Sequence, residues 1–388
     1  MSQPAAALQT LTDQVRAAAA SGTGLRILGG GSKDFYGQGL TGELLHTRGL
    51  TGITSYEPSE LVVTVRAGTP LAELEAALAD CGQCLPFEPP HFQIGDGAKM
   101  ATVGGMVAAG LSGPARASAG GVRDYMLGVQ ILNGRAELLS FGGTVMKNVA
   151  GYDVSRLMAG SMGTLGLISE VSLKVLPVAP AEASLVFELP QTAALAQLHR
   201  WGAQPLPLNA SRWLRDDTGS GKDPRELLHV RLRGAVAAVE AACTRMLGDT
   251  PGNRIDPVQA ASDWQACRDL QLPFFSQTPP PDMGLWRLSV AQTAPELNLP
   301  WPQLIEWHGG LRWLWAPANA AGQVRAAAQK AGGNATLFIA DYACLSGVSA
   351  TFDRFPGLVP PLDTIHLRLK AEFDPANIFN RGRLFRQD

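Results

Sequence analysis

Hydrophobic residues recur at helical spacing near the start of the chain. Leu8, Leu11, Val15 and Ala18 are three or four positions apart, which places them on one face of a helix that ends at Ser21-Gly22. Short apolar runs then alternate with turn residues, as is typical of strands. The predicted strands are 25–28, 53–56 and 61–66, and a second predicted helix starts at Thr69-Pro70 and ends at Gly82.

Further strands are predicted after residue 125. Asn133-Gly134 lies between the apolar runs 129–132 and 137–141, which predicts a hairpin with a type I′ turn and positive φ at both central residues. A long strand, 164–175, follows. Because strands and helices are mixed without regular βαβ alternation, the sequence predicts an α+β fold.

A change of composition divides the chain. Before residue 180 lie 28 of the 43 glycines, whereas all eight tryptophans lie after residue 200. Two prolines in 176–180 form a plausible linker between the halves. We therefore predict domains 1–178 and 179–371, and a C-terminal segment, 372–388, that returns to the first domain. The second domain should be a smaller α+β unit with helices near 234–246 and 318–331.

Charge and hydropathy exclude several classes of protein. With 32 Lys+Arg against 34 Asp+Glu, the net charge of −2 gives no reason to expect nucleic acid as a partner. The uncharged stretch 100–115 is short and contains four glycines, so it does not predict a transmembrane helix. The N-terminus has no basic start followed by an apolar core, so we expect a cytoplasmic protein.

Three glycine clusters point to an extended ligand. Gly29-Gly30-Gly31-Ser32-Lys33 follows a strand directly, and such a run can direct backbone N–H groups at an anion such as a phosphate. Its spacing differs from the dinucleotide and P-loop fingerprints, so an ordinary turn stays open on this cluster alone. Eight glycines lie in 95–121, where Thr102 could cap a short helix, and a third cluster lies in 147–177.

The clusters and their neighbours form an ordered set of motifs. They are GGGSK, VTVRAGTPLAEL, FEPPHFQIGDGAKMATVGGMVAAG, GGVRDYMLGVQILNG and GGTVMKNVAGYDVSRLMAGSMGTLGLISEVSLKVLP. This order resembles the PCMH-type FAD-binding domain of the vanillyl-alcohol oxidase flavoprotein family, and within it the FAD-binding E subunits of bacterial glycolate oxidases. The C-terminal FDPANIFNRGRLF resembles the family's closing segment, with Arg381 and Arg383 in place of a proline and a lysine.

The resemblance implies a two-subdomain FAD-binding domain, a cap domain and a set of cofactor-binding residues. These are Gly29, Gly30, Gly31, Ser32, Lys33, Gly95, Thr102, Gly104, Gly105, Gly121, Arg123, Asp124 and Ile168. Neither Ser32 nor Lys33 is the histidine that covalent members carry on this loop. The resemblance therefore implies FAD that is bound noncovalently.

The same resemblance implies a function in a heteromeric glycolate oxidase that converts glycolate to glyoxylate. Its partners would be a larger FAD subunit and an iron–sulfur subunit that receives the electrons, and the complex could associate peripherally with the inner membrane. Two alternatives stay open: a stand-alone FAD-dependent dehydrogenase of a 2-hydroxy acid or alcohol, and a non-catalytic scaffold that has lost flavin.

Other chemistry-bearing residues give weaker signals. Cys81 and Cys84 form a C-x-x-C that follows a helix end, so we interpret them as structural. No two of the six histidines lie within five residues of each other, and no metal site is predicted. The His-x-His and Gly-Asp-Gly-Asn-x-His motifs of related 2-hydroxy-acid dehydrogenases do not occur after residue 180.

The aromatic run 307–315 is interpreted as a core strand with Arg312 in solvent, although a surface for a partner or ligand stays open. A substrate carboxylate would favour a guanidinium, and Arg312, Arg368 and Arg383 are candidates by residue type alone. The sequence assigns no catalytic residue.

Overall fold

The computed structural model describes residues 3–39, 41–92, 100–143, 153–217, 224–276, 282–340 and 352–384. The chain divides into two compact units. Unit 1 comprises Met1–Ser112, Gly121–Val178 and Gly357–Asp388, and unit 2 comprises Gly113–Gly120 and Ala179–Pro356. Both units mix helices and largely antiparallel sheets, so the fold is α+β, as the sequence predicts.

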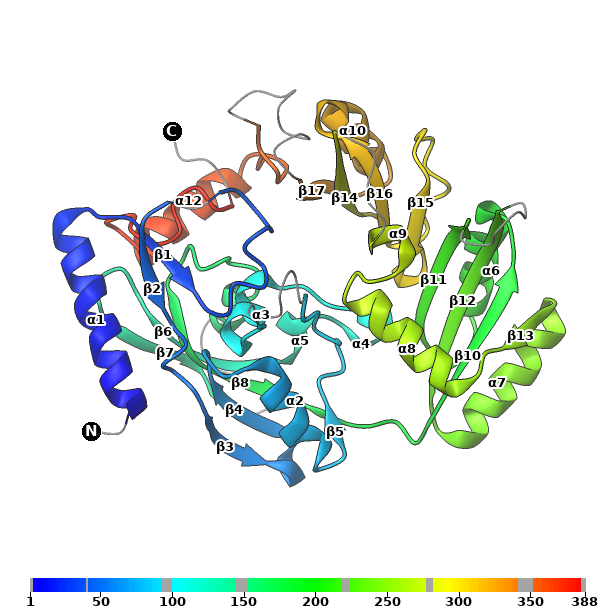
Figure 1. Ribbon diagram of the computed structural model, residues 1–388, viewed down its shortest axis with the longest axis horizontal. Coiled ribbons are helices and arrows are strands. Elements are labelled where there is room, and N and C mark those ends of the chain that lie inside the picture. The colour runs from blue at the N-terminus through cyan, green and yellow to red at the C-terminus, as the bar shows by residue number, and fades with distance from the viewer. Residues whose placement is uncertain are drawn as a thin grey trace. The chain divides into compact units, whose positions relative to one another are not determined.

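Unit 1 is built on a five-stranded antiparallel sheet with the order β3-β4-β8-β6-β7 (Figure 1). Its strands are β3 (Ile53–Glu57), β4 (Val62–Arg66), β6 (Met126–Leu132), β7 (Leu138–Gly142) and β8 (Leu167–Lys174). Helices α2 (Leu71–Ala79) and α3 (Val103–Ala109) share its apolar core. The smaller elements are η1 (Pro58–Glu60), α5 (Val122–Tyr125), η2 (Ser155–Met158) and the β5 (Gln83–Cys84) and β9 (Leu176–Pro177) pair.

A second, separate core in unit 1 lies around a parallel pair of strands. Strands β1 (Leu25–Leu28) and β2 (Glu43–His46) pair in register from Leu25↔Glu43 to Leu28↔His46. Helix α1 (Gln3–Ser21) packs Leu11, Val15 and Ala18 into this core, as its spacing predicts. Ile378 and Phe379 from the C-terminal segment complete the core. Unit 1 thus has the two hydrophobic cores of a two-subdomain structure.

The connection between β6 and β7 differs from the predicted type I′ turn. Leu132 pairs with Leu138, so five residues link the strands, and the left-handed position is Ala136, with φ of 59°, rather than Asn133 or Gly134. The Asn133 side chain accepts hydrogen bonds from the N–H groups of Arg135 and Glu137, which stabilises this longer turn. The Asn133-Gly134 signal predicted the position of the hairpin correctly, but the predicted turn type was wrong.

Unit 2 contains an eight-stranded sheet with the order β13-β10-β12-β11-β15-β16-β14-β17. Its strands are β10 (Ala181–Glu188), β11 (Leu208–Asp216), β12 (Arg225–Gly234), β13 (Gly252–Arg254), β14 (Met283–Ser289), β15 (Gln303–Glu306), β16 (Leu311–Pro317) and β17 (Asn334–Ile339). Its helices are α4 (Arg116–Ala119), α6 (Gln191–Gly202), α7 (Val236–Asp249), α8 (Pro257–Arg268), α9 (Pro273–Ser276), η3 (Trp307–Gly309), η4 (Ala318–Ala320) and α10 (Ala321–Lys330).

The two faces of this sheet differ in chemistry. Helices α6 and α7 pack on side chains such as Leu185, Leu228 and Ile305, which form an apolar core. The alternate positions carry buried polar side chains. Trp264 of α8 donates to Ser184 at 2.8 Å, and Cys267 of α8 lies against Glu306. Where α6, α7 and α8 pack, one face of the sheet is therefore an ordinary hydrophobic core, and the other carries buried polar side chains.

The unit boundaries differ in two places from the predicted segments 1–178, 179–371 and 372–388. Unit 1 resumes at Gly357 rather than at residue 372, and Gly113–Gly120 belongs to unit 2. Helix α12 (Leu362–Phe373) belongs to unit 1 because its Lys370 ammonium donates to the Thr164 carbonyl at 2.7 Å and Phe373 enters the core of the five-stranded sheet. The sequence predicts no domain boundary before α12, although prolines occur within 356–361.

The position of Arg312 differs from the second prediction, which placed its side chain in solvent. The run 307–315 does supply a core strand, β16, but the Arg312 side chain is fully buried rather than solvated. Its guanidinium donates to the carbonyls of Gly309 and Ala294 at 2.9 and 3.1 Å. These bonds stabilise a turn in which Trp307 and His308 both have φ of 54°, a conformation that bulky residues rarely adopt.

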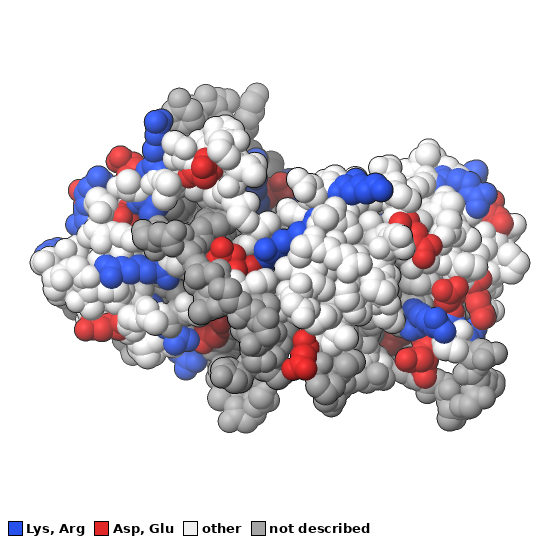
Figure 2. Space-filling view, turned by 90° about the horizontal axis from the view of Figure 1, so that it is seen from above, with Lys and Arg blue, Asp and Glu red and all other residues white. Residues whose placement is uncertain are grey.

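The surface is not dominated by one charge. Figure 2 shows basic and acidic side chains interspersed among uncharged residues over the described atoms of the face it presents. Among the described residues, no helix combines the length and apolar composition needed to cross a bilayer.

Candidate functional site

The loop that follows β1 presents unpaired backbone amides. The Arg48 guanidinium donates to the carbonyl oxygens of Gly29 and Gly30 at 3.0 and 3.4 Å. Because C=O and N–H point in opposite directions in a trans peptide, the amides of Gly30 and Gly31 are directed away from Arg48. Within the described ranges, the N–H groups of Gly29 to Ser32 donate to no protein atom. A set of free amides on one short loop is suited to bind an anion.

A second segment, 100–105, packs directly against these glycines. A Cβ atom on Gly29 would lie 2.5 Å from Thr102 Oγ1, and one on Gly30 would lie 1.4 Å from the Met100 carbonyl oxygen. Thr102 is the N-cap of α3, and its hydroxyl accepts from the Gly105 N–H at 3.3 Å, as the sequence predicts. The first two clusters contain glycine because two backbone segments approach each other here.

A third segment, 162–168, lies opposite. A Cβ atom on Gly163 would lie 2.7 Å from Asn380 Nδ2, and one on Gly166 would lie 2.9 Å from the Leu132 carbonyl. Gly163 and Gly166 also have positive φ, 71° and 150°. The close approach and the backbone conformation both exclude a side chain at these positions. The third cluster therefore brings the backbone close to β6 and to the C-terminal segment.

These segments line an open cavity of about 110 Å³. Its described lining is Ile27, Leu28, Gly29, Gly30, Gly31, Ser32, Lys33, Asp34, Thr47, Ala67, Thr102, Gly104, Gly105, Ala108, Ala109, Met162, Gly163, Gly166, Ile168, Asn380 and Arg383. Small and apolar side chains predominate, and polar groups gather on the glycine loop.

The charged groups around the loop favour an anionic guest. Asp34 forms an ion pair with Arg26 at 3.0 Å, so its charge is balanced. Lys33 contributes an ammonium that lies 5.6 Å from the Phe92 ring centroid and 3.3 Å from Ser32 Oγ. With Arg383 also in the lining, the basic groups outnumber the acidic ones among the described lining residues.

The structure brings together most of the site residues predicted from the sequence. Gly29 to Lys33, Thr102, Gly104, Gly105 and Ile168 all line the cavity. Gly95 lies outside the described residues. Gly121, Arg123 and Asp124 do not belong to the described lining; the Asp124 carboxylate instead accepts the Gly121 N–H at 2.8 Å and closes the first turn of α5.

Three residues of the site and its support carried only weak signals, or none, in the sequence. Asn380 and Arg383 come from the C-terminal segment, about 350 positions after the glycine loop, and Arg383 contacts this loop only in the folded chain. Arg48 does not line the cavity, yet it orients the loop through the two glycine carbonyls. The resemblance of the closing segment to its family counterpart was the one feature that could have indicated Asn380 and Arg383.

The comparisons agree with this geometry. Residues 5–142 match the family model described as FAD binding domain. The chain is 43% identical over 377 residues to the glycolate oxidase subunit GlcE of Escherichia coli, and the match covers 97% of both chains. This chain belongs to the GlcE family. Over 156 residues, 40% of the chain, it is also 28% identical to the glycolate oxidase subunit GlcD of Bacillus subtilis, of which 32% is covered.

A solved structure supports the fold. The GlcE-type chain aligns with alkyldihydroxyacetonephosphate synthase at a TM-score of 0.64, with 16% identity, over 95% of this chain and 74% of the other. The cofactor of this family of flavoproteins is FAD, and the cavity fits such a group. The unpaired amides of Gly29 to Ser32 suit a pyrophosphate, whereas the glycines and alanines of α3 that line the cavity form a wall of small residues suited to flat rings.

The remaining candidates of the sequence do not form a second site. Among the described residues, no three His, Cys, Asp or Glu side chains are grouped so as to hold a metal ion. Cys81 and Cys84 are not joined in a disulfide. Burial, together with a hydrogen bond to Cys81, raises the pKa of Tyr56 to about 12. Arg312 is occupied by backbone carbonyls, and Arg368 lies exposed on α12.

Proposed function

We propose that this chain is the FAD-carrying E subunit of a heteromeric glycolate oxidase. The complex would oxidise glycolate to glyoxylate, and this chain would hold its FAD noncovalently in the cavity of unit 1. Its partners would be a larger FAD subunit and an iron–sulfur subunit that accepts the electrons. We place the complex in the cytoplasm, with peripheral association at the inner membrane through the other subunits.

The observation that carries this proposal is the likeness to GlcE over nearly the whole of both chains. The cavity supports it, because the motifs that prompted the FAD expectation line one site in the fold. The amides of Gly29 to Ser32, which donate to no protein atom in the described ranges, argue against a scaffold that has lost flavin, since they leave an anion site in place at the cavity.

The chemistry requires an electron acceptor outside this chain. Oxidation of glycolate removes a proton from the hydroxyl and a hydride from the carbinol carbon. Bound FAD supplies a two-electron acceptor that can release its electrons singly. The five cysteines of this chain include no set of four at iron–sulfur spacing, so a cluster would have to come from another chain. In this chain, the amides of the glycine loop would hold the cofactor, and Arg48 orients the loop through the carbonyls of Gly29 and Gly30.

The test is the visible absorption spectrum of the purified chain before and after anaerobic addition of glycolate, with and without the co-expressed partner subunits. Flavin bands that bleach only with the partners present are the expected result. Bleaching of the isolated chain at the rate of the complex would instead identify a stand-alone dehydrogenase. A folded chain without flavin bands, even after FAD is added, would contradict the cofactor assignment.

A further inference from the structure

The C-terminal segment 374–383, called the latch below, forms one edge of the smaller core of unit 1. Leu25 of β1 donates its N–H to the Ile378 carbonyl at 2.7 Å, and Asn380 donates its N–H to the Leu25 carbonyl at 2.9 Å. The resulting bridge between Leu25 and Phe379 is parallel. Strand β1 therefore has β2 on one side and the latch on the other, and the glycine loop begins where β1 ends.

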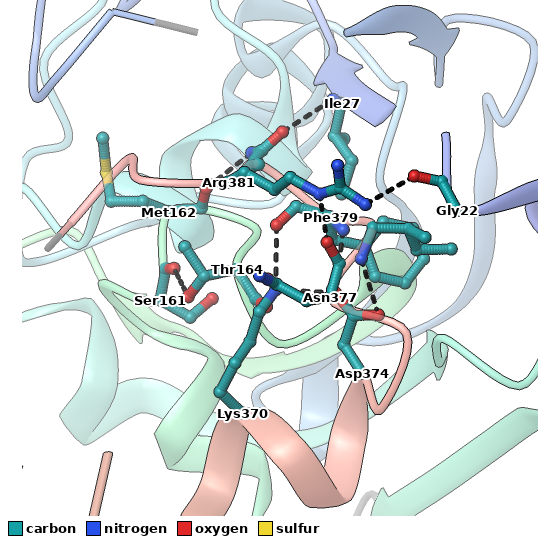
Figure 3. A network of polar contacts seen from close by, with 12 residues as sticks. Gly22, Ile27, Ser161, Met162, Thr164, Lys370, Asp374, Asn377, Phe379 and Arg381 are labelled. Atoms are coloured by element: carbon teal, nitrogen blue, oxygen red, sulfur yellow. Dashed lines mark hydrogen bonds and ion pairs between the residues drawn. The ribbon is translucent and has the colours of Figure 1, made fainter. Parts of the chain in front are cut away.

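The start of the latch is fixed by a buried ion pair (Figure 3). Asp374 accepts the N–H groups of Ile378 and Phe379 at 3.0 and 2.8 Å, and it accepts the Lys370 ammonium at 2.6 Å. Lys370 also donates to the carbonyls of Thr164 and Phe379 at 2.7 and 2.9 Å. The ammonium thus joins the latch to the segment that carries Gly163 and Gly166.

Asn380 joins two walls of the cavity. Its Oδ1 accepts the Ile27 N–H at 2.8 Å, and its Nδ2 donates to the Met162 carbonyl at 2.7 Å. Ile27 and Met162 both line the cavity, one just before the glycine loop and the other at the start of the 162–168 segment. The carboxamide therefore fixes the separation between these two walls.

Arg383 holds the returning arm of the glycine loop. Its guanidinium donates to the Gln38 carbonyl at 2.6 Å and to the carbonyls of Lys33 and Asp34 at 3.2 and 3.1 Å. The side chain is buried. Because the carbonyls of Gly29 and Gly30 accept from Arg48, the loop is held by one arginine at each end, and its free amides lie between them.

Arg381 lies in the latch as well, but its hydrogen-bond partners differ from those of Arg383. Its guanidinium donates to the Gly22 carbonyl at 2.7 Å and to the Asn377 carbonyl (Figure 3). Arg381 does not belong to the described lining of the cavity. Both arginines thus connect the latch to backbone carbonyls elsewhere, but only Arg383 connects it to the glycine loop.

We propose that Asn380 and Arg383 are positioning residues for the FAD site, and that docking of the latch and binding of FAD are coupled. The inference rests on the proposed occupancy of the cavity by FAD. If the docked latch holds the loop in the conformation that binds FAD, then FAD must stabilise the docked latch by the same factor. A merely structural Arg383 would stabilise unit 1 without this coupling.

The first test titrates flavin-free full-length protein with FAD by fluorescence quenching for the wild type and the Arg383→Ala, Arg383→Lys and Arg381→Ala variants. We expect Arg383→Ala to weaken FAD binding by a factor within the usual range of couplings, about 5- to 150-fold. Arg383→Lys should restore part of the affinity, because an ammonium can reach some of the same carbonyls. Arg381→Ala should weaken FAD binding less than Arg383→Ala does, because Arg381 ties the latch to Gly22 and does not reach the glycine loop.

The second test needs no variant. Hydrogen exchange of the wild type is followed at the amides of Leu25, Phe379 and Asn380 with and without FAD, and FAD should slow all three. Equal FAD affinity in Arg383→Ala and Arg381→Ala, or exchange that FAD does not change, would overturn the coupling. Failure of the wild type itself to bind FAD would instead overturn the proposed function.

Discussion

The carbonyl oxygen of Met100 occupies the place that a side chain of Gly30 would need. A Cβ atom built on Gly30 would lie 1.4 Å from this oxygen, and neither group can move away cheaply because both are backbone. The contact joins the first two glycine clusters at the cavity. It also explains why a run of glycines, rather than a general turn sequence, follows β1.

Gly30→Ala should therefore abolish FAD binding. The added methyl group must separate the glycine loop from the 100–105 segment, which displaces the amides that face the cavity. We expect the purified variant to be colourless and to stay so when FAD is added. Gly39→Ala is the matched control, since a Cβ atom there meets nothing within 4 Å, and it should keep the visible flavin spectrum. A yellow Gly30→Ala protein with wild-type affinity would contradict this account of the loop.

The flavin should be released by denaturation. The described lining of the cavity contains no His, Cys or Tyr side chain, the groups through which a flavin could be attached covalently. Acid precipitation is therefore expected to leave all of the flavin in the supernatant and none on the polypeptide. Flavin fluorescence that stays with the protein band in a denaturing gel would show a covalent link and refute the noncovalent assignment.

Local sequence signals predicted the parts of the site that depend on neighbouring residues. The strand at 25–28, the glycine run after it and the Thr102 cap are all properties of a few consecutive residues. Such features follow from backbone conformation and capping, which are local. The ordered set of motifs predicted the cofactor, because this set resembles a family whose cofactor is FAD.

The contacts that complete the site could not be derived from local patterns. In the sequence, Gly134 resembled a turn residue. In the fold, it must lack a side chain because a Cβ atom built on it would lie 2.4 Å from Asp374 Oδ1. Arg383 reaches carbonyls 345 and more positions earlier in the chain. Neither relationship has a sequence period or a short motif, so only the fold reveals it.

The Lys370–Asp374 pair should contribute strongly to stability. Lys370→Met would leave the Asp374 carboxylate, whose side chain is 0% exposed, without its cation. Removal of one partner of a buried ion pair typically costs about 3–5 kcal/mol. We expect the free energy of unfolding in urea to fall by that order. Arg225→Met removes a partner of the exposed Glu188 pair and should leave the unfolding midpoint nearly unchanged. Equal effects of the two variants would argue against the role of Lys370.

His308 should make the protein less stable as the pH falls. Burial lowers the pKa of this imidazole to about 4, well below its usual value. The Ser211 hydroxyl lies 3.0 Å from Nδ1 and accepts from the His308 N–H, while Ser118 Oγ lies 3.0 Å from Nε2. Between pH of about 4 and 6.5 the unfolded chain binds more protons at this site, so stability is lost as the pH decreases through that window.

The variant His308→Asn tests this, because asparagine tolerates the left-handed backbone at this position. Urea unfolding at a series of pH values should show that His308→Asn loses less stability than the wild type on acidification from pH of about 7 to 4. Burial also lowers the pKa of His229, and this residue contributes the same pH dependence of stability to both proteins. A difference between the two proteins that does not change with pH would rule out the proposed titration of His308.

Glu306 should make the protein less stable as the pH rises, over a pH range that overlaps that of His308. Burial raises the pKa of its carboxyl to about 7, although Trp313, Cys267 and two arginines oppose the shift. The carboxyl accepts the Trp313 indole N–H at 2.7 Å and faces the Cys267 thiol at 3.4 Å. In this case the folded chain binds more protons, so the stabilising contribution is complete below the unfolded pKa of about 4.5 and is lost as the pH rises through about 7.

Glu306→Gln should therefore become more stable relative to the wild type as the pH is raised from about 5 to 8, by up to about 3 kcal/mol, because the amide never carries the buried charge. Glu296→Gln is the control: this exposed carboxylate accepts from the Thr192 hydroxyl, and the difference from wild type should not vary comparably with pH. The measurement is the free energy of urea unfolding at each pH. If the Glu306→Gln difference is as flat as that of the control, Glu306 is ionised in the folded protein throughout, and the polar face of the unit 2 sheet carries a permanent buried charge.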